Sequence, residues 1–143
     1  MASELKVDKF TGVTTAGSIL VTGEGGSTAT NLQQGLSKCW VRWNMSGTAA
    51  NTDSLGVSSI SDLGTGVCKQ TLTNPFNNIT FIIITGIGEL TGGGNRGIGI
   101  YSSSSNEPTT TTTTFFSFSF PSDGGTSAND VDLNSAAWQG DLA

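Results

Sequence analysis

The sequence contains no histidine, and charged residues make up only 12% of its 143 positions. Without histidine the chain cannot build a Ser–His–Asp triad, a Cys–His pair or a histidine-ligated metal site. The two cysteines, Cys39 and Cys68, are too few to complete a structural zinc site in one chain. We therefore expect no enzyme activity, no cofactor and no metal.

Positive charge is also scarce, because four Lys and two Arg stand against 11 Asp and Glu and leave a net charge of -5. A nucleic-acid partner requires cations that neutralise phosphates, and an anionic membrane surface requires them too, so both are excluded. The longest apolar stretch, residues 81–88, is too short to span a bilayer, so no membrane insertion is expected. Met1–Lys9 has no apolar core segment of a signal peptide, which predicts synthesis in a cytosol and reduced thiols.

Glycine, serine, threonine and asparagine are abundant instead, with 20 glycines in the chain. This composition is typical of strands joined by tight turns, and no segment shows a convincing helical period. We predict an all-β fold, an antiparallel β-sandwich that is jelly-roll-like, with a short extended N-terminal docking segment. Residues 1–35 are expected to form that segment and a hinge, and residues 36–143 the globular sandwich. Within the first part, residues 4–10 alternate polar and apolar side chains and predict a strand.

The first strand of the sandwich is predicted at residues 38–45. Side chains alternate between the faces of a strand, so the apolar set would face the core and a second set would face outward. Trp40 and Arg42 belong to the outward set. Trp40 is either a surface aromatic covered by a loop or a subunit contact, since tryptophan is enriched at interfaces. The apolar set is Cys39, Val41, Trp43 and Met45.

Three further segments complete the core prediction. Residues 54–76 are expected to form a hairpin that turns at Gly64–Gly66 and directs Cys68, Gln70 and Leu72 to one face. The isoleucine run in residues 77–85 predicts the most buried strand, covered on both faces. The last strand, which includes Val131 and Leu133, is predicted to be an edge strand with an acidic outer face.

Residues 98–105 and 109–120 flank a three-residue turn and predict a long antiparallel hairpin. In the second arm, Phe116, Phe118 and Phe120 share one face, which we assign to the core, and the serines between them share the other. Thr109–Thr114 would form the polar, projecting half of that arm, because threonine favours strands. The alternative is a disordered polar tip.

Two motifs suggest ligands but lack the required context. Gly92–Gly97 matches a dinucleotide-binding pattern, yet a strand follows where a helix is needed. Asp130, Asp132 and Asn134 mimic part of a calcium loop, but Ser135 stands where that loop needs glycine. The remaining candidates for contact with a receptor or partner are loop and strand-end residues, namely Asn95, Arg96, Tyr101 and Glu107.

Several segments resemble short proteins and fibre tips of phages that infect marine bacteria. These segments are the opening Leu5–Asp8, the passage Thr30–Leu36, the block Asp53–Ile60 continued by Asp62–Gly66, and the closing AAWQGDLA. The resemblance spans most of the chain and is weakest from Gly92 to Asn129. Val67 and Cys68 stand where the family often has Asp-Tyr, which changes the core volume but preserves the alternation.

The resemblance implies a phage virion structural protein located on the particle surface. Such a protein is usually a homotrimer that docks on other virion proteins, of the tail or the capsid, and contacts a host surface glycan or protein. The tail-fibre-like role comes first, and capsid decoration as a cement or head-fibre protein is the alternative. The expected subunit interface includes Leu5, Val7, Trp40 and Arg42. The family supplies no catalytic residues.

Overall fold

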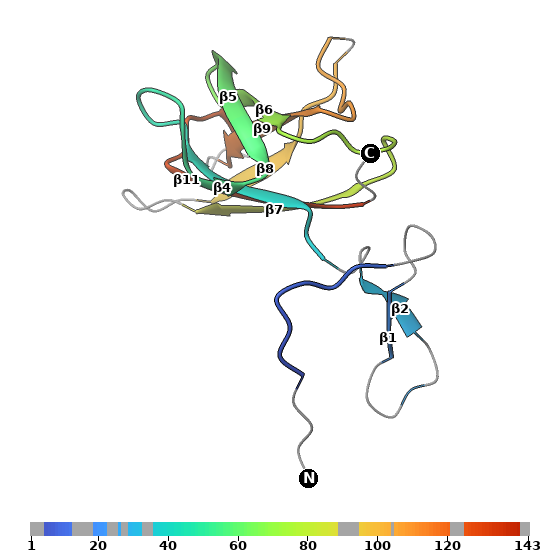
Figure 1. Cartoon of the computed structure of the whole chain (residues 1–143). Coiled ribbons are helices and arrows are strands. Elements are labelled where there is room, and N and C mark those ends of the chain that lie inside the picture. Colours follow the sequence, from blue (N-terminus) through green and yellow to red (C-terminus); the bar gives the residue numbers. More distant parts are fainter. Residues whose placement is uncertain are drawn as a thin grey trace. The chain divides into compact units, whose positions relative to one another are not determined.

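The chain divides into two compact units, Met1–Leu36 and Ser37–Ala143 (Figure 1). In this computed structural model the described residues are 5–12, 19–22, 26, 29–32, 36–88, 95–103, 105–120 and 125–140. None of the helices in this described part is long and apolar enough to cross a membrane.

The first unit contains a small antiparallel ribbon. Strand β1 (Leu20–Thr22) pairs with strand β2 (Ala29–Asn31). The predicted strand at residues 4–10 is wrong, because residues 5–12 form no strand. Alternation of side chains alone does not make a strand, since the backbone also needs a hydrogen-bonded neighbour. Leu5 and Val7 are 74% and 47% exposed there.

The second unit confirms the predicted all-β fold, with two antiparallel sheets that pack face to face (Figure 1). One sheet has four strands in the order β4-β3-β11-β7. Its strands are β3 (Cys39–Asn44), β4 (Ala50–Leu55), β7 (Ile82–Gly88) and β11 (Leu133–Gln139).

The other sheet has five strands and forms the upper layer in Figure 1. Strand β9 is central: β8 pairs with it along one edge, and β6 and β10 pair with it along the other. Strand β5 pairs with β6 and closes the sheet. The strands are β5 (Val57–Gly64), β6 (Val67–Leu72), β8 (Arg96–Ile100), β9 (Thr112–Ser119) and β10 (Ser127–Ala128).

The strand pairing of the sandwich is nested. Strand β3 pairs with β11, which is the last strand, and β6 pairs with β9 inside that outer pair. A long hairpin that is rolled up into two sheets has this arrangement, as in a jelly roll. The predicted hairpin of residues 54–76 is confirmed as β5 and β6. Residues 98–105 and 109–120 were predicted to form a hairpin with a three-residue turn. The antiparallel pairing of these two segments is confirmed as β8 with β9, but the short turn is wrong, because residues 101–111 separate the two strands.

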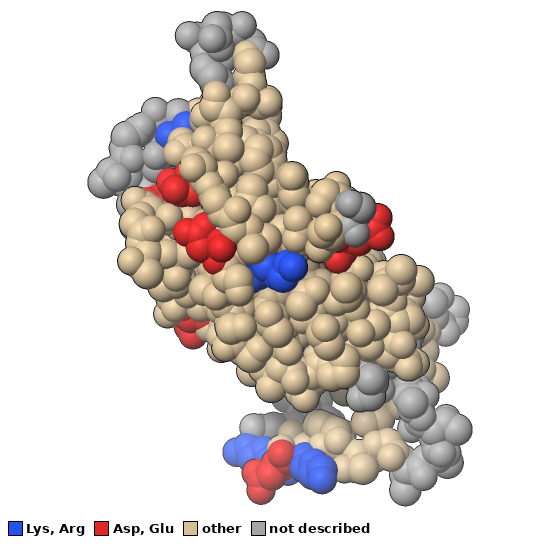
Figure 2. All heavy atoms as spheres, turned by 90° about the horizontal axis from the view of Figure 1, so that it is seen from above, with Lys and Arg blue, Asp and Glu red and all other residues tan. Residues whose placement is uncertain are grey.

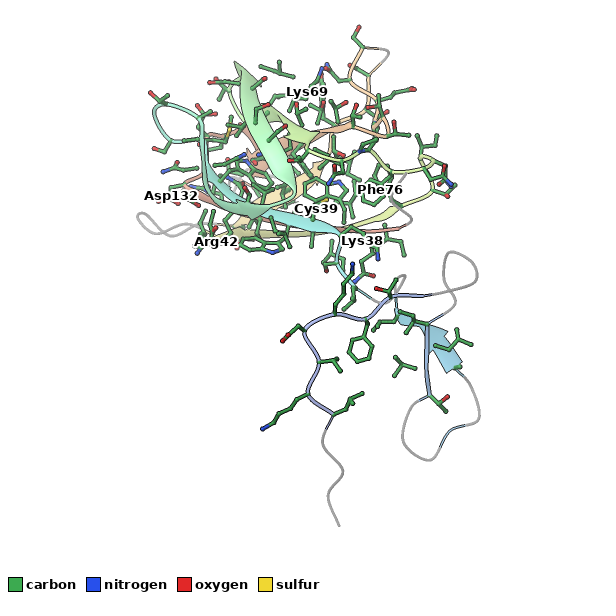
Figure 3. All side chains as sticks on the ribbon, viewed as in Figure 1. Lys38, Cys39, Arg42, Lys69, Phe76 and Asp132 are labelled. Atoms are coloured by element: carbon green, nitrogen blue, oxygen red, sulfur yellow. The ribbon has the colours of Figure 1, made fainter. Side chains whose placement is uncertain are left out.

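The core lies between the two sheets, where Figure 3 shows Cys39 and Phe76. The predicted inner face of β3 is confirmed, since its four apolar residues are at most 3% exposed. The Phe115 ring lies between two tryptophans of the opposite sheet, with ring centroids 5.1 Å from Trp43 and 5.7 Å from Trp138. Such aromatic pairs add about 0.5–1.5 kcal/mol each beyond the area they bury.

Polar side chains also join the sheets across the core. The Ser117 hydroxyl of β9 donates to Asn134 Oδ1 of β11 at 3.0 Å, and Asn134 Nδ2 donates to the Val131 carbonyl at 2.8 Å. The Trp138 indole N–H donates to Thr113 Oγ1 at 3.1 Å. Buried polar groups need such partners, because burial without them costs about 1–3 kcal/mol each.

These contacts overturn the predicted orientation of β9. Phe115, Ser117 and Thr113 face the core, whereas Phe116 and Phe118 lie on the outer face, and Phe120, just past the strand, is 48% exposed. Burial of Ser117 leaves its hydroxyl with a hydrogen-bond partner, because Asn134 Oδ1 accepts from it. The outer phenylalanines pack against one another instead.

The predicted projecting threonine arm is also wrong, and so is the disordered tip. Thr113 and Thr114 are fully buried inside β9, where they pair with Gln70 and Lys69 of β6. Thr109 forms a turn before the strand, in which its Oγ1 accepts from the backbone N–H of Thr112 at 3.0 Å. The threonine run is therefore a turn followed by an interior strand.

Two predictions about the four-stranded sheet are wrong as well. Strand β7 is an edge strand of that sheet, and its Ile82 and Ile84 are 63% and 54% exposed, so it is not covered on both faces. Strand β11 is not an edge strand, because β3 and β7 flank it. Strand order depends on contacts between distant segments, which a local pattern of side chains does not contain.

Candidate interaction surfaces

The four predicted receptor-contact residues do not form one site. Arg96 begins β8 on the face that Ile98 turns toward the core, whereas Tyr101 follows the strand on the opposite, outer face. Asn95 is exposed before β8, and its carbonyl accepts from the Phe120 N–H at 3.0 Å. Glu107 is exposed in the connection between β8 and β9.

Tyr101 instead begins a line of aromatic rings across the outer face of the five-stranded sheet. We call this line the aromatic row, and its members are Tyr101, Phe116, Phe118 and Phe120. The ring centroids of successive members are 6.0, 5.5 and 5.0 Å apart. Figure 2 views this side of the sandwich, and charged side chains are sparse over it.

Glycines of β8 make room for the aromatic row. Gly97 pairs with Phe118, and a Cβ at Gly97 would lie 2.5 Å from the Phe118 ring atoms Cε2 and Cζ. The ring therefore lies over the backbone of the neighbouring strand. Gly99 pairs with Phe116, but a Cβ there would meet nothing within 4 Å. The row is thus partly buried within the chain and partly open to solvent.

The outer face of the four-stranded sheet carries a second apolar surface. Trp40 pairs with Leu55 on one side and with Ala137 on the other, and Ala137 pairs with Ile84. We call this line across all four strands the Trp40 row. Leu55 and Ile84 are 55% and 54% exposed, and Trp40 and Ala137 are half-buried.

The neighbours of the Trp40 row on this face are mostly uncharged. Ile82 extends the row along β7 and is 63% exposed. The adjacent line contains Arg42 paired with Asp53 across β3 and β4, so the charges of the four strands on this face balance. Figure 3 shows Arg42 on this outer side and Lys69 on the outer side of the other sheet. The structure therefore places Trp40 and Arg42 together on one open face.

The other two predicted interface residues, Leu5 and Val7, lie in the first unit, and both are exposed. Phe10, Leu20 and Val21 of that unit are also exposed, by 62%, 60% and 49%. A unit with one short ribbon has few neighbours that could cover these side chains.

The two cysteines are buried, unpaired with each other and located in the core. Burial raises the pKa of the Cys39 thiol to about 12. Burial also raises the pKa of Cys68 to about 12, although its contact with the Trp43 indole acts in the opposite direction. Neither thiol is an activated nucleophile, because the reactive thiolate is disfavoured. Within the described ranges, no three acidic, cysteine or histidine side chains are grouped as metal ligands would be.

Comparisons with protein-family models, with curated proteins and with solved structures found no match to this chain.

Of the Trp40 row the sequence predicted only Trp40 as an interface residue, and of the aromatic row only Tyr101, as a ligand contact. The outward position of Trp40 follows from the alternate apolar positions Cys39, Val41 and Trp43 in β3. The phenylalanines were assigned to the core because large apolar side chains are usually inside. The glycines of β8 were the available signal, since glycine in a strand often marks a place where another group approaches closely.

Proposed function

We propose that this protein is a phage virion structural protein of the tail-fibre-like kind. It docks on the particle through its N-terminal unit, assembles as a homotrimer and presents the sandwich for attachment to the host surface. The observation that carries the proposal is that one sandwich has apolar surfaces on both outer faces, the Trp40 row and the aromatic row. A protein that works by assembly and adhesion needs such surfaces and needs no catalytic group.

The two surfaces support two different contacts. The Trp40 row and the exposed side chains of the first unit, including Leu5 and Val7, support association with sister chains or virion proteins. The aromatic row supports attachment, because aromatic rings offer apolar contact area at low entropic cost. The resemblance of Asp53–Gly66 and of the closing residues to marine phage proteins supports the same proposal.

Capsid decoration is the second candidate, in which the protein binds the outer shell rather than the tail. It is supported by the small size of the chain, 143 residues, and by the short N-terminal unit, because a long fibre needs a shaft. The sandwich and its two apolar surfaces suit both roles.

Immunogold labelling of intact particles tests the proposal. We expect gold on the tail for a fibre-like protein and on the head for a decoration protein, and absence of label from purified particles would contradict both. Binding of the purified protein to host cells tests the attachment role. Tyr101→Ala should reduce binding, whereas Ile79→Ala, at an exposed apolar residue outside the ring contacts, is the control.

A further inference from the structure

The outer face of the four-stranded sheet ends at strand β7, whose free edge is not covered by any strand in the described part of the chain. Strand β7 runs for seven residues with an unbroken register against β11, and it contains no charged residue and no proline. The described residues pair it with no strand other than β11. A long, regular, apolar edge exposes unpaired backbone groups that another chain can cover.

The other outer edges of the sandwich carry the usual protective features. Strand β4 contains Asp53 and a shifted register against β3, and β5 contains Asp62 and two shifts. Strand β8 has only five residues and begins with Arg96, and β10 has two. Such charges, bulges and short lengths prevent unwanted strand association. The open edge at β7 is therefore a local exception, and it coincides with the exposed Ile82 and Ile84.

The Trp40 row has the composition of an interface core. Its centre is a half-buried tryptophan, its ends are exposed aliphatic side chains, and the polar residues Ser135 and Gln139 lie beside it on β11. Buried interface centres are depleted in charge and enriched in aromatic residues, with a polar rim. The aromatic row differs, because its rings already pack on one another and over Gly97.

The charges on this face favour a second copy of the same chain as the molecule that covers it. The whole chain carries a net charge of -5, so two copies repel each other in general. On this face Arg42 of β3 pairs with Asp53 of β4, and Lys38 lies just before β3, so the face lacks the net negative charge of the whole chain and copies can approach here without that repulsion. In a closed ring of copies, Arg42 of each copy can lie against Asp53 of the next, which is the kind of contact that a trimer needs.

We infer that the Trp40 row and the β7 edge form the surface through which copies of this chain associate. This inference rests on the homotrimer in the proposed function and adds the face that builds it. Covering the face removes Leu55, Ile82 and Ile84 from water and shields the open edge in the same step. The aromatic row stays free on the opposite side of the sandwich.

Light scattering of the purified full-length protein after size-exclusion chromatography, over a series of concentrations, tests the inference. The wild-type chain should form an oligomer, and Ile84→Lys should weaken association by about tenfold or more, because it brings an unpaired charge into the interface. Ile79→Lys is the matched control: Ile79 is 66% exposed just before β7 and outside the face, so association should not change. Leu55→Lys, at the far end of the row, should repeat the Ile84→Lys result if that variant folds poorly.

Any one of four outcomes would overturn the inference, and the first three concern the wild type and the lysine variants. They are a monomeric wild-type protein, unchanged association in both Ile84→Lys and Leu55→Lys, and equal loss in Ile79→Lys. A fourth is loss of association in a Leu5→Asp/Val7→Asp variant while both lysine variants still associate, which would assign assembly to the first unit. None of these results depends on where the protein lies on a particle. A failed association test would therefore leave the proposed location untouched, and a failed labelling test would leave the association surface untouched.

Discussion

The two outer faces of the sandwich use apolar side chains in different ways. On the five-stranded sheet the exposed rings lie along one strand and contact each other, and Phe118 also covers Gly97 of the next strand. On the four-stranded sheet the Trp40 row crosses all four strands, and its end residues are more than half exposed. The rings of the first surface are therefore partly covered by contacts within the chain. The second surface is left open by the described residues of the sandwich, which is why the proposed association surface is assigned to it.

The largest difference in the free energy of unfolding is expected between variants of two neighbouring phenylalanines of β9 that point to opposite faces. Phe115→Ala should lower the free energy of unfolding by about 3–5 kcal/mol, because it removes a fully buried ring between Trp43 and Trp138. Phe116→Ala should cost less than about 2 kcal/mol, since it removes ring contacts on the surface. Urea unfolding measures both, and equal losses would mean that the aromatic row belongs to the core.

A smaller effect should come from the glycines under the aromatic row. Gly97→Ala forces the Phe118 ring to move, because the new Cβ would lie 2.5 Å from two ring atoms, and it should destabilise the protein by about 1 kcal/mol. Gly99→Ala, two residues on and on the same face, meets nothing within 4 Å and should be neutral or slightly stabilising. Thermal unfolding of the two variants compares them, and a Gly97→Ala protein as stable as the Gly99→Ala protein would contradict the predicted crowding.

A comparison of the two inner faces uses the thiol that each sheet contributes to the core. Burial raises the pKa of Cys39 and of Cys68 from 9.0 to about 12. Above pH 9 the unfolded chain therefore loses thiol protons that the folded chain keeps. Stability from this source is complete below pH 9 and declines as the pH rises toward 12.

Urea unfolding over this pH range measures the decline. A Cys39→Ala/Cys68→Ala protein should have a lower free energy of unfolding overall, because it loses packed volume, but a flatter dependence on pH above 9. Parallel curves for the two proteins would show that other groups cause the alkaline decline.

The sequence predicted those elements whose pattern is local and unambiguous. In β3 the apolar residues Cys39, Val41 and Trp43 stand at alternate positions, so their inward face followed directly, and Leu72 of β6 is buried as predicted. In β9 both faces had apolar or small residues, so the choice depended on Asn134 and Trp138, which lie in another sheet and accept or donate the deciding hydrogen bonds.

The candidate surfaces were harder to predict for a related reason. The isoleucines of β7 resemble those of a strand buried on both sides, and the difference is only that no part of the described chain covers Ile82 and Ile84. A strand buried by a partner and a strand buried by its own chain have the same composition. The register that aligns Leu55, Trp40, Ala137 and Ile84 also joins segments far apart in sequence.

The nested pairing of β3 with β11 sets the order of events during synthesis. β3 emerges from the ribosome early, but one of its two neighbours in the sheet, β11, is the last strand of the described chain. Contacts of such large sequence separation form late and slow the folding of β proteins. Ala137 of β11 is translated long after Trp40, its partner in β3. The proposed association face is therefore complete only after β11 has been translated and has paired with β3.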